Sequence, residues 1–188
     1  LMMGMINASY SNVVSSFFSA KFQRNIEEIL VAPVSKTTMI FGFISGGILR
    51  GLLVGALIYL VSLFFTQFQV YSIMQIILFS ILTASAFALA GLINGIYAKK
   101  FDDISIIPTF VLTPLTYFGG VFYTLESLPE FWLALSKFNP IVYMIDGFRA
   151  GFYNIHYFQN SSNLTVLIVL NIALFALAHK LIQKVTRV

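Results

Sequence analysis

The sequence TTMIFGFISGGILRGLLVGALIYLVSLFF, residues 37–65, is mostly apolar and contains a single charged residue, Arg50. A helix needs about 20 mostly apolar residues to cross the hydrocarbon core of a bilayer, and this run is longer than that. No proline interrupts it. The run therefore predicts a transmembrane helix.

The composition of the whole chain agrees with a membrane protein. Hydrophobic residues make up 59% of the chain and charged residues only 10%, whereas soluble domains contain about 25% charged residues. The mean hydropathy is +0.89. A soluble domain of this length would lack the polar side chains to cover its surface. The absence of cysteine excludes disulfides, thiolate metal sites and cysteine nucleophiles.

Four other segments are apolar enough to span or nearly span a bilayer, and they are residues 1–20, 70–98, 104–125 and 163–182. We therefore predict an all-α, polytopic integral membrane protein with a single transmembrane domain over residues 1–188. It has five transmembrane helices here, and six are expected in the complete chain, because a cytoplasmic N-terminus requires one more span upstream.

Basic residues predict the orientation in the membrane, since Lys and Arg are enriched in the short loops on the cytoplasmic side. One side of the predicted bundle carries Lys21, Arg24, Lys36, Lys99, Lys100, Lys180, Lys184 and Arg187. The opposite side carries Lys137 and Arg149. We expect a multi-pass protein of the inner (plasma) membrane, with residues 22–36, residues 99–103 and the C-terminus in the cytoplasm.

The first predicted cytoplasmic loop, FQRNIEEILVAPVS, has the pattern of a short amphipathic helix over residues 22–34. Its apolar face comprises Phe22, Ile26, Ile29 and Leu30, and its polar face comprises Gln23, Arg24, Glu27 and Glu28. Asn25 can cap this helix, with Glu28 three residues on, and Pro33 ends it. An acidic polar face suits a groove in another protein better than an anionic lipid surface, although an interfacial helix is the alternative.

Arg50 lies near the middle of its predicted span, where an arginine costs about 2.5–3.5 kcal/mol on insertion scales. Small residues surround it along the helix, namely Gly42, Gly46, Gly47, Gly51 and Gly55. This pattern allows close helix packing, so we expect Arg50 to face protein or a wet cavity. A packing role is favoured over contact with a substrate, and both interpretations stay open.

Between the last two spans, residues 127–152 predict two short helices on the external side. Ser127 and Glu130 form a capping-box pattern, and Asn139-Pro140 separates the first helix from a second one over residues 141–152. Asp146 and Arg149 are three residues apart, so their charges can pair. Each helix is too short to cross a bilayer, which predicts a re-entrant hairpin.

Aromatic residues gather in and before this hairpin. They are Tyr117, Phe118, Tyr123, Phe131 and Trp132. These rings could line an exit and stack on cargo, but an interfacial aromatic belt is the better supported interpretation. Pro108 and Pro114 in the preceding span predict kinks.

Two stretches, NIEEILVAPVS and PLTYFGGVFYTLESLPEFWLALSKFNPIVYMIDGFRAGF, resemble the type-2 ATP-binding-cassette (ABC-2) export permeases, the membrane subunits of drug, polysaccharide and related exporters. The resemblance implies that residues 22–34 are a coupling helix that docks into a separate ABC ATPase subunit. It further implies a dimer of permeases, with the hairpin near the exit. It makes residues 1–20 the second span of the family, whose first span is missing here.

The predicted function is therefore export of a drug-like, lipid or glycan-like substrate, driven by ATP that a partner hydrolyses. This chain contains no G-x-x-x-x-G-K-[ST] loop, so we expect it to be no enzyme and to hold no cofactor, with ATP and Mg²⁺ in the ATPase. The expected partners are that ATPase, a second permease copy and membrane lipid, but no nucleic acid.

Three alternative functions make different demands on the sequence. An ion-coupled secondary transporter would carry acidic residues in its spans, and the predicted spans contain none. An intramembrane hydrolase would need a serine beside a histidine or an aspartate, but His156 and His179 lie outside the middle of any span. A non-transporting structural membrane subunit stays open.

Overall fold

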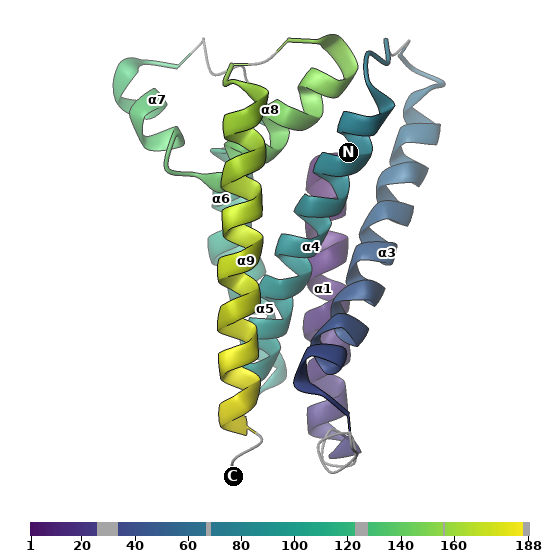
Figure 1. The fold of residues 1–188 in the computed structure, drawn as a ribbon, viewed down its shortest axis with the longest axis vertical. Coiled ribbons are helices and arrows are strands. Elements are labelled where there is room, and N and C mark those ends of the chain that lie inside the picture. The colour runs from purple at the N-terminus through teal and green to yellow at the C-terminus, as the bar shows by residue number, and fades with distance from the viewer. Residues whose placement is uncertain (26–33, 67–68, 123–127, 156, 186–188) are drawn as a thin grey trace.

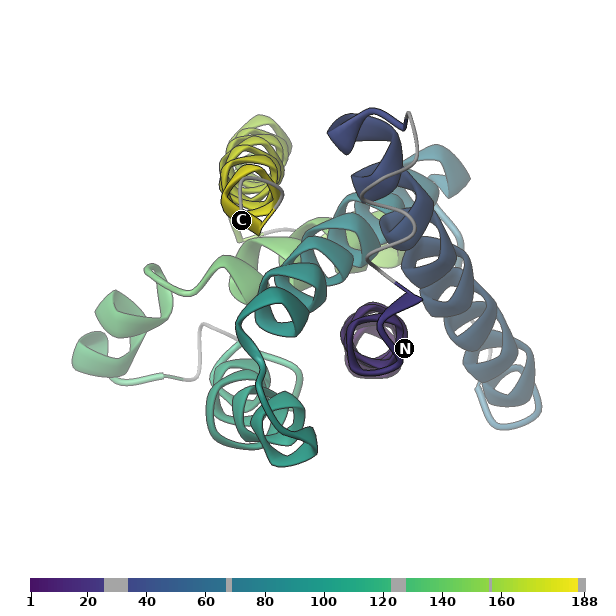
Figure 2. The same ribbon diagram turned by 90° about the horizontal axis from the view of Figure 1, so that it is seen from below.

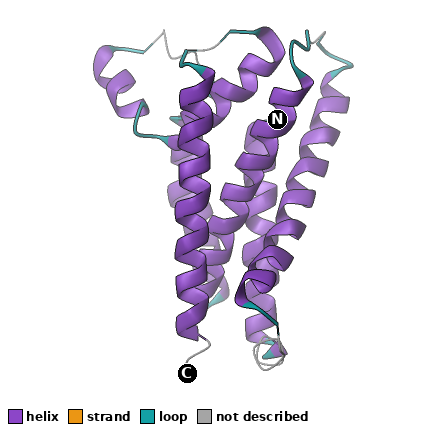
Figure 3. Ribbon diagram, in the orientation of Figure 1, coloured by secondary structure: helices purple, strands orange, loops and turns teal. Residues whose placement is uncertain are grey.

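A computed structural model describes residues 1–25, 34–66, 69–122, 128–155 and 157–185. These residues form helices joined by loops and contain no strand, which confirms the all-α prediction (Figure 3). Four long helices run along the same axis: α1 (Met2–Phe22), α3 (Lys36–Ser62), α4 (Ile73–Tyr97) and α9 (Asn160–Val185) (Figure 1). The shorter elements are α5 (Phe101–Ile107), the π-helical segment η1 (Pro108–Leu112), α6 (Thr113–Tyr117), α7 (Glu130–Ser136) and α8 (Pro140–Tyr153).

The two ends of the bundle differ. Helices α7 and α8 lie at one end, which we call the hairpin end (Figure 1). The last residues of α1 and α9 lie at the other, which we call the C-terminal end. Helix α4 passes between α9 on one side and α1 on the other, with α3 next to α1 (Figure 2). It is therefore the central helix of the bundle.

Three of the described helices are long and apolar enough to cross a membrane: Lys36–Ser62, Ile73–Tyr97 and Asn160–Gln183. They match the spans predicted at residues 37–65, 70–98 and 163–182 to within a few residues. Helix α1 has 21 residues and lies beside them, but it carries more polar side chains. The count of five spans stays a prediction.

The span predicted at residues 104–125 differs from the structure at both ends. Its helical path begins at Phe101, passes through α5, η1 and α6, and ends at Tyr117. Gly120 then turns the chain with a φ of 80°, a conformation that glycine adopts readily. Of the two prolines predicted to cause kinks, Pro108 begins η1, in which the Thr113 N–H donates to the Pro108 carbonyl five residues back, and Pro114 lies in the first turn of α6.

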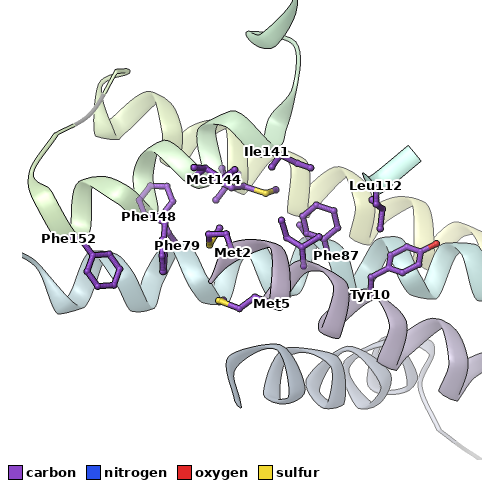
Figure 4. Packing of buried hydrophobic residues seen from close by; sticks show 14 of the residues in the cluster. Met2, Met5, Tyr10, Phe79, Phe87, Leu112, Ile141, Met144, Phe148 and Phe152 are labelled. Atoms are coloured by element: carbon purple, nitrogen blue, oxygen red, sulfur yellow. The ribbon is translucent and has the colours of Figure 1, made fainter. Parts of the chain in front are cut away.

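Two clusters of buried apolar residues fill the interior. The cluster nearer the hairpin end joins α1, α4 and α8, and it includes Tyr10, Phe79, Phe87, Ile141 and Met144 (Figure 4). The cluster nearer the C-terminal end joins α1, α3, α4 and α9, and it includes Val13, Ile40, Ile44, Leu92 and Ile182. Helix α8 is thus packed into the bundle and does not lie loose on its surface.

Candidate functional site

Helix α1 has one buried half and one polar half. Its buried half comprises Met2, Met5, Ile6, Ser9, Tyr10, Val13, Val14, Phe17 and Phe18. The other half, which we call the polar face of α1, carries Asn7, Ser11, Asn12, Ser15, Ser16 and Ser19, none of them buried. Exposed hydroxyl and amide groups are unfavourable against hydrocarbon. The polar face therefore suits water or another protein better than lipid.

Glycine contacts hold α1 in this orientation. On one side, a Cβ atom at Gly51 of α3 would collide with the Ser9 side chain. On the other, a Cβ atom at Gly91 of α4 would lie 2.5 Å from the Tyr10 carbonyl oxygen. The Asn94 amide also donates a 2.7 Å hydrogen bond to the Tyr10 hydroxyl. The backbones approach closely on both sides, which fixes the direction in which the polar face points.

Arg50 is exposed on α3 in the single chain. One helical turn before it, a Cβ atom at Gly46 would lie 3.5 Å from Asn12 Oδ1, an atom of the polar face of α1. Arg50 therefore lies on the side of α3 that borders this face. Of the glycines expected to pack, Gly47, Gly51 and Gly55 are buried against α1, whereas Gly42 has open space around it. The role of Arg50 stays a prediction.

The predicted coupling helix begins in the structure with the end of α1. Phe22 is the last residue of α1, and its ring packs against those of Phe18 and Phe101. Arg24 follows with a φ of 62°, and the Asn25 side chain donates to Gln23 Oε1. Phe22 thus belongs to α1, and the positive φ at Arg24 separates it from the rest of the predicted range of 22–34. The remaining predicted contacts, Ile26, Glu27, Glu28, Ile29 and Leu30, lie outside the described residues.

Lys21 ties this end of α1 to the last turn of α4. Its ammonium group donates to the carbonyl oxygens of Ile96, at 2.8 Å, and Ala98, at 2.9 Å. A cation that meets the free carbonyls at a helix C-terminus is stabilising. The end of α1 is thereby anchored to the junction of α4 and α5.

At the same junction, Asp103 fixes the start of α5. Its carboxylate accepts hydrogen bonds from the backbone N–H groups of Lys99, at 2.8 Å, and Lys100, at 3.0 Å. These two bonds hold the pKa of Asp103 below its ordinary value, because they favour the charged form.

The hairpin has the predicted order of elements. Helix α7 ends at Ser136, and α8 begins at Pro140 with Asn139 as its N-cap, whose side chain accepts from the Ile141 N–H. The Asn139 amide also donates 2.7 Å to the Leu115 carbonyl oxygen of α6. The predicted break at Asn139-Pro140 is confirmed, whereas Ser127 of the predicted capping box lies outside the described residues.

The predicted pairing of Asp146 with Arg149 is wrong. Asp146 is buried, and its carboxylate accepts from the backbone N–H groups of Tyr157 and Phe158 and from the Asn163 amide. Arg149 instead donates 3.0 Å to the Gly120 carbonyl oxygen. Each residue satisfies free groups of a different loop, so α8 holds two connections in place.

The predicted aromatic residues come together between α6 and α7. The rings of Phe118 and Trp132 stack with centroids 5.8 Å apart, and Phe131 meets Trp132 edge to face. Tyr117 stacks on Phe122. Tyr123 lies outside the described residues. Phe118 and Trp132 also line an apolar pocket of about 300 Å³ between α6 and α7.

The polar face of α1 and the polar contacts of Lys21, Asn94 and Asn163 were missed at the sequence level. A helical projection of residues 1–20 would have placed nearly all polar side chains of α1 on one half. Asn94 lies inside a predicted span, where a polar side chain is a signal for an interhelical hydrogen bond. The described residues hold no cluster of three or more His, Asp or Glu side chains that could bind a metal.

Together, the apolar helices α3, α4 and α9, the two-sided α1 and the buried α8 define a polytopic helical membrane protein. The profile of the ABC-2 type transporter family matches residues 1–153, and the chain belongs to this family. It is 55% identical over 184 residues to the inner membrane transport permease YadH of Escherichia coli K12, covering 98% of this chain and 72% of that relative.

A more distant relative is nodulation protein J of Rhizobium leguminosarum bv. trifolii, 24% identical over 145 residues, which cover 77% of this chain and 55% of the relative. No solved structure matches the chain. The protein is thus a multi-pass membrane permease of an ATP-binding-cassette transporter in the inner membrane. The secondary-transporter and structural-subunit alternatives are set aside.

Proposed function

We propose that two copies of this permease form an export pathway for an amphipathic substrate of the drug, lipid or glycan class. Separate ABC ATPase subunits supply the energy and hold ATP and Mg²⁺. The single observation that carries this proposal is the polar face of α1, which lies among apolar helices and borders Arg50. A pathway between two copies gives that face the aqueous surroundings that lipid cannot provide.

The proposal includes five spans, formed by α1, α3, α4, the path from Ile104 through η1 and α6, and α9. The C-terminal end of the bundle faces the cytoplasm. Support for this orientation comes from Lys21, Lys36, Lys99 and Lys100, which flank the helix ends there. The hairpin of α7 and α8 then lies at the external side, re-entrant and close to the exit.

Coupling takes place through the segment that follows α1. The ATPase binds residues 22–34 and moves α1. The end of α1 is hydrogen-bonded through Lys21 to the end of α4. The glycine contacts of α1 with α3 and α4 make these three helices move together. The motion therefore changes the direction of the polar face relative to the second copy.

Cysteine accessibility tests the pathway, and the chain offers a clean background because it contains no cysteine. We expect Ser11→Cys and Ser15→Cys, both on the polar face of α1, to react with a membrane-impermeant methanethiosulfonate reagent in the purified permease–ATPase complex. Addition of ATP and vanadate should change their labelling rates by roughly tenfold, since closing a route to water removes the thiolate from the reagent.

The matched control is Leu49→Cys on the exposed apolar side of α3, away from the face that carries Arg50, which should stay unlabelled in both states. Equal, slow labelling at all three positions would show that the polar face of α1 meets lipid or packed protein, and the pathway proposal would then be abandoned.

A further inference from the structure

Arg50 is a cation in the middle of a helix that is long enough to cross the membrane. It lies 14 residues after Lys36 and 12 residues before Ser62, the two ends of α3. These separations correspond to about 21 Å and about 18 Å along the helix axis, so the side chain cannot reach lipid headgroups at either end. A guanidinium keeps its charge in proteins. Water or an anion at that height therefore has to compensate Arg50.

The register of α1 against α3 shows what lies beside Arg50. One turn before Arg50, a Cβ atom at Gly46 would lie 3.5 Å from Asn12 Oδ1. One turn after Arg50, a methyl carbon of Val54 would lie 3.6 Å from a Cβ atom at Gly4. Residues four apart share a helix face. Arg50 is therefore level with the part of α1 between Gly4 and Asn12, and the two helices lie side by side there (Figure 2).

This part of α1 offers a small side chain and free hydrogen-bond donors. Ala8 is midway between Gly4 and Asn12 and thus at the level of Arg50. In the described part of the chain, neither the Asn12 amide nor the Arg50 guanidinium has a hydrogen-bond or ion-pair partner. Ser11 is exposed next to Asn12. A guanidinium fork with amide and hydroxyl groups beside it is a donor set that suits phosphate, sulfate or carboxylate oxygens.

Neither this sequence nor a second copy of it supplies an anion at that height. The sequence contains seven acidic residues, and none of them lies in α1, α3, α4 or α9. Asp146 of α8 is already hydrogen-bonded to the loop before α9. The other six follow the ends of α1 or α4, or lie in or next to the hairpin: Glu27, Glu28, Asp102, Asp103, Glu126 and Glu130. A symmetric second copy has the same residues at the same heights, so it adds only another Arg50.

The anion that remains is one that enters the pathway. Two copies bring two Arg50 cations to the same height, where like charges repel more strongly than in water because the dielectric constant is low. An anion bound there removes this repulsion and offsets the cost of placing arginine in a span. Given the export pathway proposed above, we infer that its substrate carries a phosphate, sulfate or carboxylate group, which Arg50 and Asn12 bind. Neutral and cationic amphiphiles are then poor substrates.

Two thiol reagents of opposite charge test the field of Arg50 without knowledge of the substrate. Ser11→Cys is introduced into the full-length permease in complex with its ATPase, in dodecyl maltoside. Its reaction rates with anionic sulfonatoethyl and cationic trimethylammonioethyl methanethiosulfonate are compared with those of a free thiol. We expect a preference of roughly tenfold for the anionic reagent, as in a cleft that concentrates ions of one sign. Arg50→Gln should remove this preference, and Arg50→Lys, which keeps the charge, should retain it.

Protection by an anionic amphiphile tests the binding itself. Dodecyl phosphate is added to the same complex, and Ser11→Cys is labelled with methyl methanethiosulfonate, an uncharged reagent whose rate does not depend on the local field. We expect labelling to be lost as dodecyl phosphate saturates the site when Arg50 is present, and to be unchanged in the Arg50→Gln background. Dodecyltrimethylammonium, which has the same alkyl chain and the opposite charge, should protect neither protein.

The outcomes separate this inference from the pathway on which it rests. A Ser11→Cys thiol that no reagent labels would refute the pathway, and the anionic substrate with it. Labelling that responds to ATP and vanadate but not to dodecyl phosphate would leave the pathway in place and overturn the anionic substrate, as would equal protection in the Arg50→Gln background.

A reagent preference equal to that of a free thiol would also overturn the anionic substrate, because a carboxylate from a further part of a longer chain would then neutralise Arg50. If Arg50→Gln fails to fold, the complex with Arg50 intact still decides the question. Its reagent preference and the contrast between the two charged amphiphiles are measured without that variant.

Discussion

At the scale of single residues, Asp146 shows how a charge is used inside this bundle. Its carboxylate is buried, yet it accepts three hydrogen bonds from groups at the start of α9 and in the loop before it. A buried carboxylate is tolerated when its oxygens are satisfied in this way. Asp146 therefore sets where α9 begins relative to α8.

Replacement of Asp146 by Ala should be among the most damaging single changes in the hairpin. It leaves the N–H groups of Tyr157 and Phe158 and the Asn163 amide without their acceptor, at a cost of about 3 kcal/mol in the free energy of unfolding. Thermal unfolding in a mild detergent measures this loss. Arg149→Gln, which removes one bond to a carbonyl, should cost only about 1 kcal/mol, and equal losses would contradict this assignment of partners.

We expect Asp103, at the junction of α4 and α5, to make the free energy of unfolding depend on pH. Hydrogen bonds from Lys99 and Lys100 lower the pKa of this carboxyl in the folded protein below the ordinary value of 3.8. The stabilisation is therefore present above pH 3.8 and is lost as the pH falls through the lowered pKa.

Asp103→Asn should accordingly melt below the native protein at neutral pH, and the difference should shrink on acidification toward pH ~3. Melting curves of both proteins across this range provide the measurement. A difference that stays constant down to that pH would show that the carboxylate charge contributes nothing at this position.

At the scale of helices, α1 depends on close approach to its two neighbours. The Gly91 position leaves no room for a side chain, since a Cβ atom would lie 2.5 Å from the Tyr10 carbonyl oxygen and the backbone cannot turn away. At Gly42 of α3, by contrast, nothing lies within 4 Å. Packing therefore requires a glycine at position 91, whereas it leaves room for a larger side chain at position 42.

Gly91→Ala should push α1 and α4 apart and destabilise the protein by about 1–3 kcal/mol, as overpacking does. Gly42→Ala should be neutral or slightly stabilising, because alanine is the better helix former by about 1 kcal/mol. Thermal unfolding of both variants under the same conditions tests the pair. A neutral Gly91→Ala would show that the α1–α4 contact can widen without cost.

The helices themselves were largely predictable from sequence, because the thickness of a bilayer demands apolar runs of a given length. The runs behind α3, α4 and α9 have this length, and the Asn139-Pro140 signal placed α8 to within a residue at each end. Contacts between elements were not predictable. The turn at Gly120 and the bonds of Asp146 and Arg149 depend on loops that are distant in sequence, which i, i+3 spacing does not report.

The polar face of α1 was predictable and was missed. The apolar run over residues 1–20 predicts a span, but only the positions of its Asn and Ser side chains around the helix indicate that one half is polar. Gln75 makes a contact that the sequence could not predict. Its amide donates to both the Gly147 carbonyl and Asn160 Oδ1 and so joins α4, α8 and α9. No pattern within α4 alone would indicate such a contact.

At the scale of the whole molecule, the permease is expected to work only together with its ATPase. The acidic pair Glu27 and Glu28 follows α1 in the predicted docking segment. We expect an ABC ATPase to co-purify with the native full-length protein in mild detergent. It should be lost from the Glu27→Lys, Glu28→Lys double variant, in which reversed charges oppose those of the docking cleft.

The control is a variant with the same two-residue charge reversal elsewhere, Asp102→Lys with Glu130→Lys, which should retain the ATPase. An ATPase that remains bound to the Glu27, Glu28 variant would place the docking surface in another part of the cytoplasmic side.

The two-sided character of α1 has a consequence for how the protein is made. A translocon releases a segment into lipid according to its hydrophobicity, and α1 falls outside the three described helices that are apolar enough to span alone. We therefore expect α1 to enter the bilayer together with α3, which follows it in the chain and carries the glycines that pack against it. The glycines that pack α3 against α1 would then serve membrane insertion as well as the stability of the folded bundle.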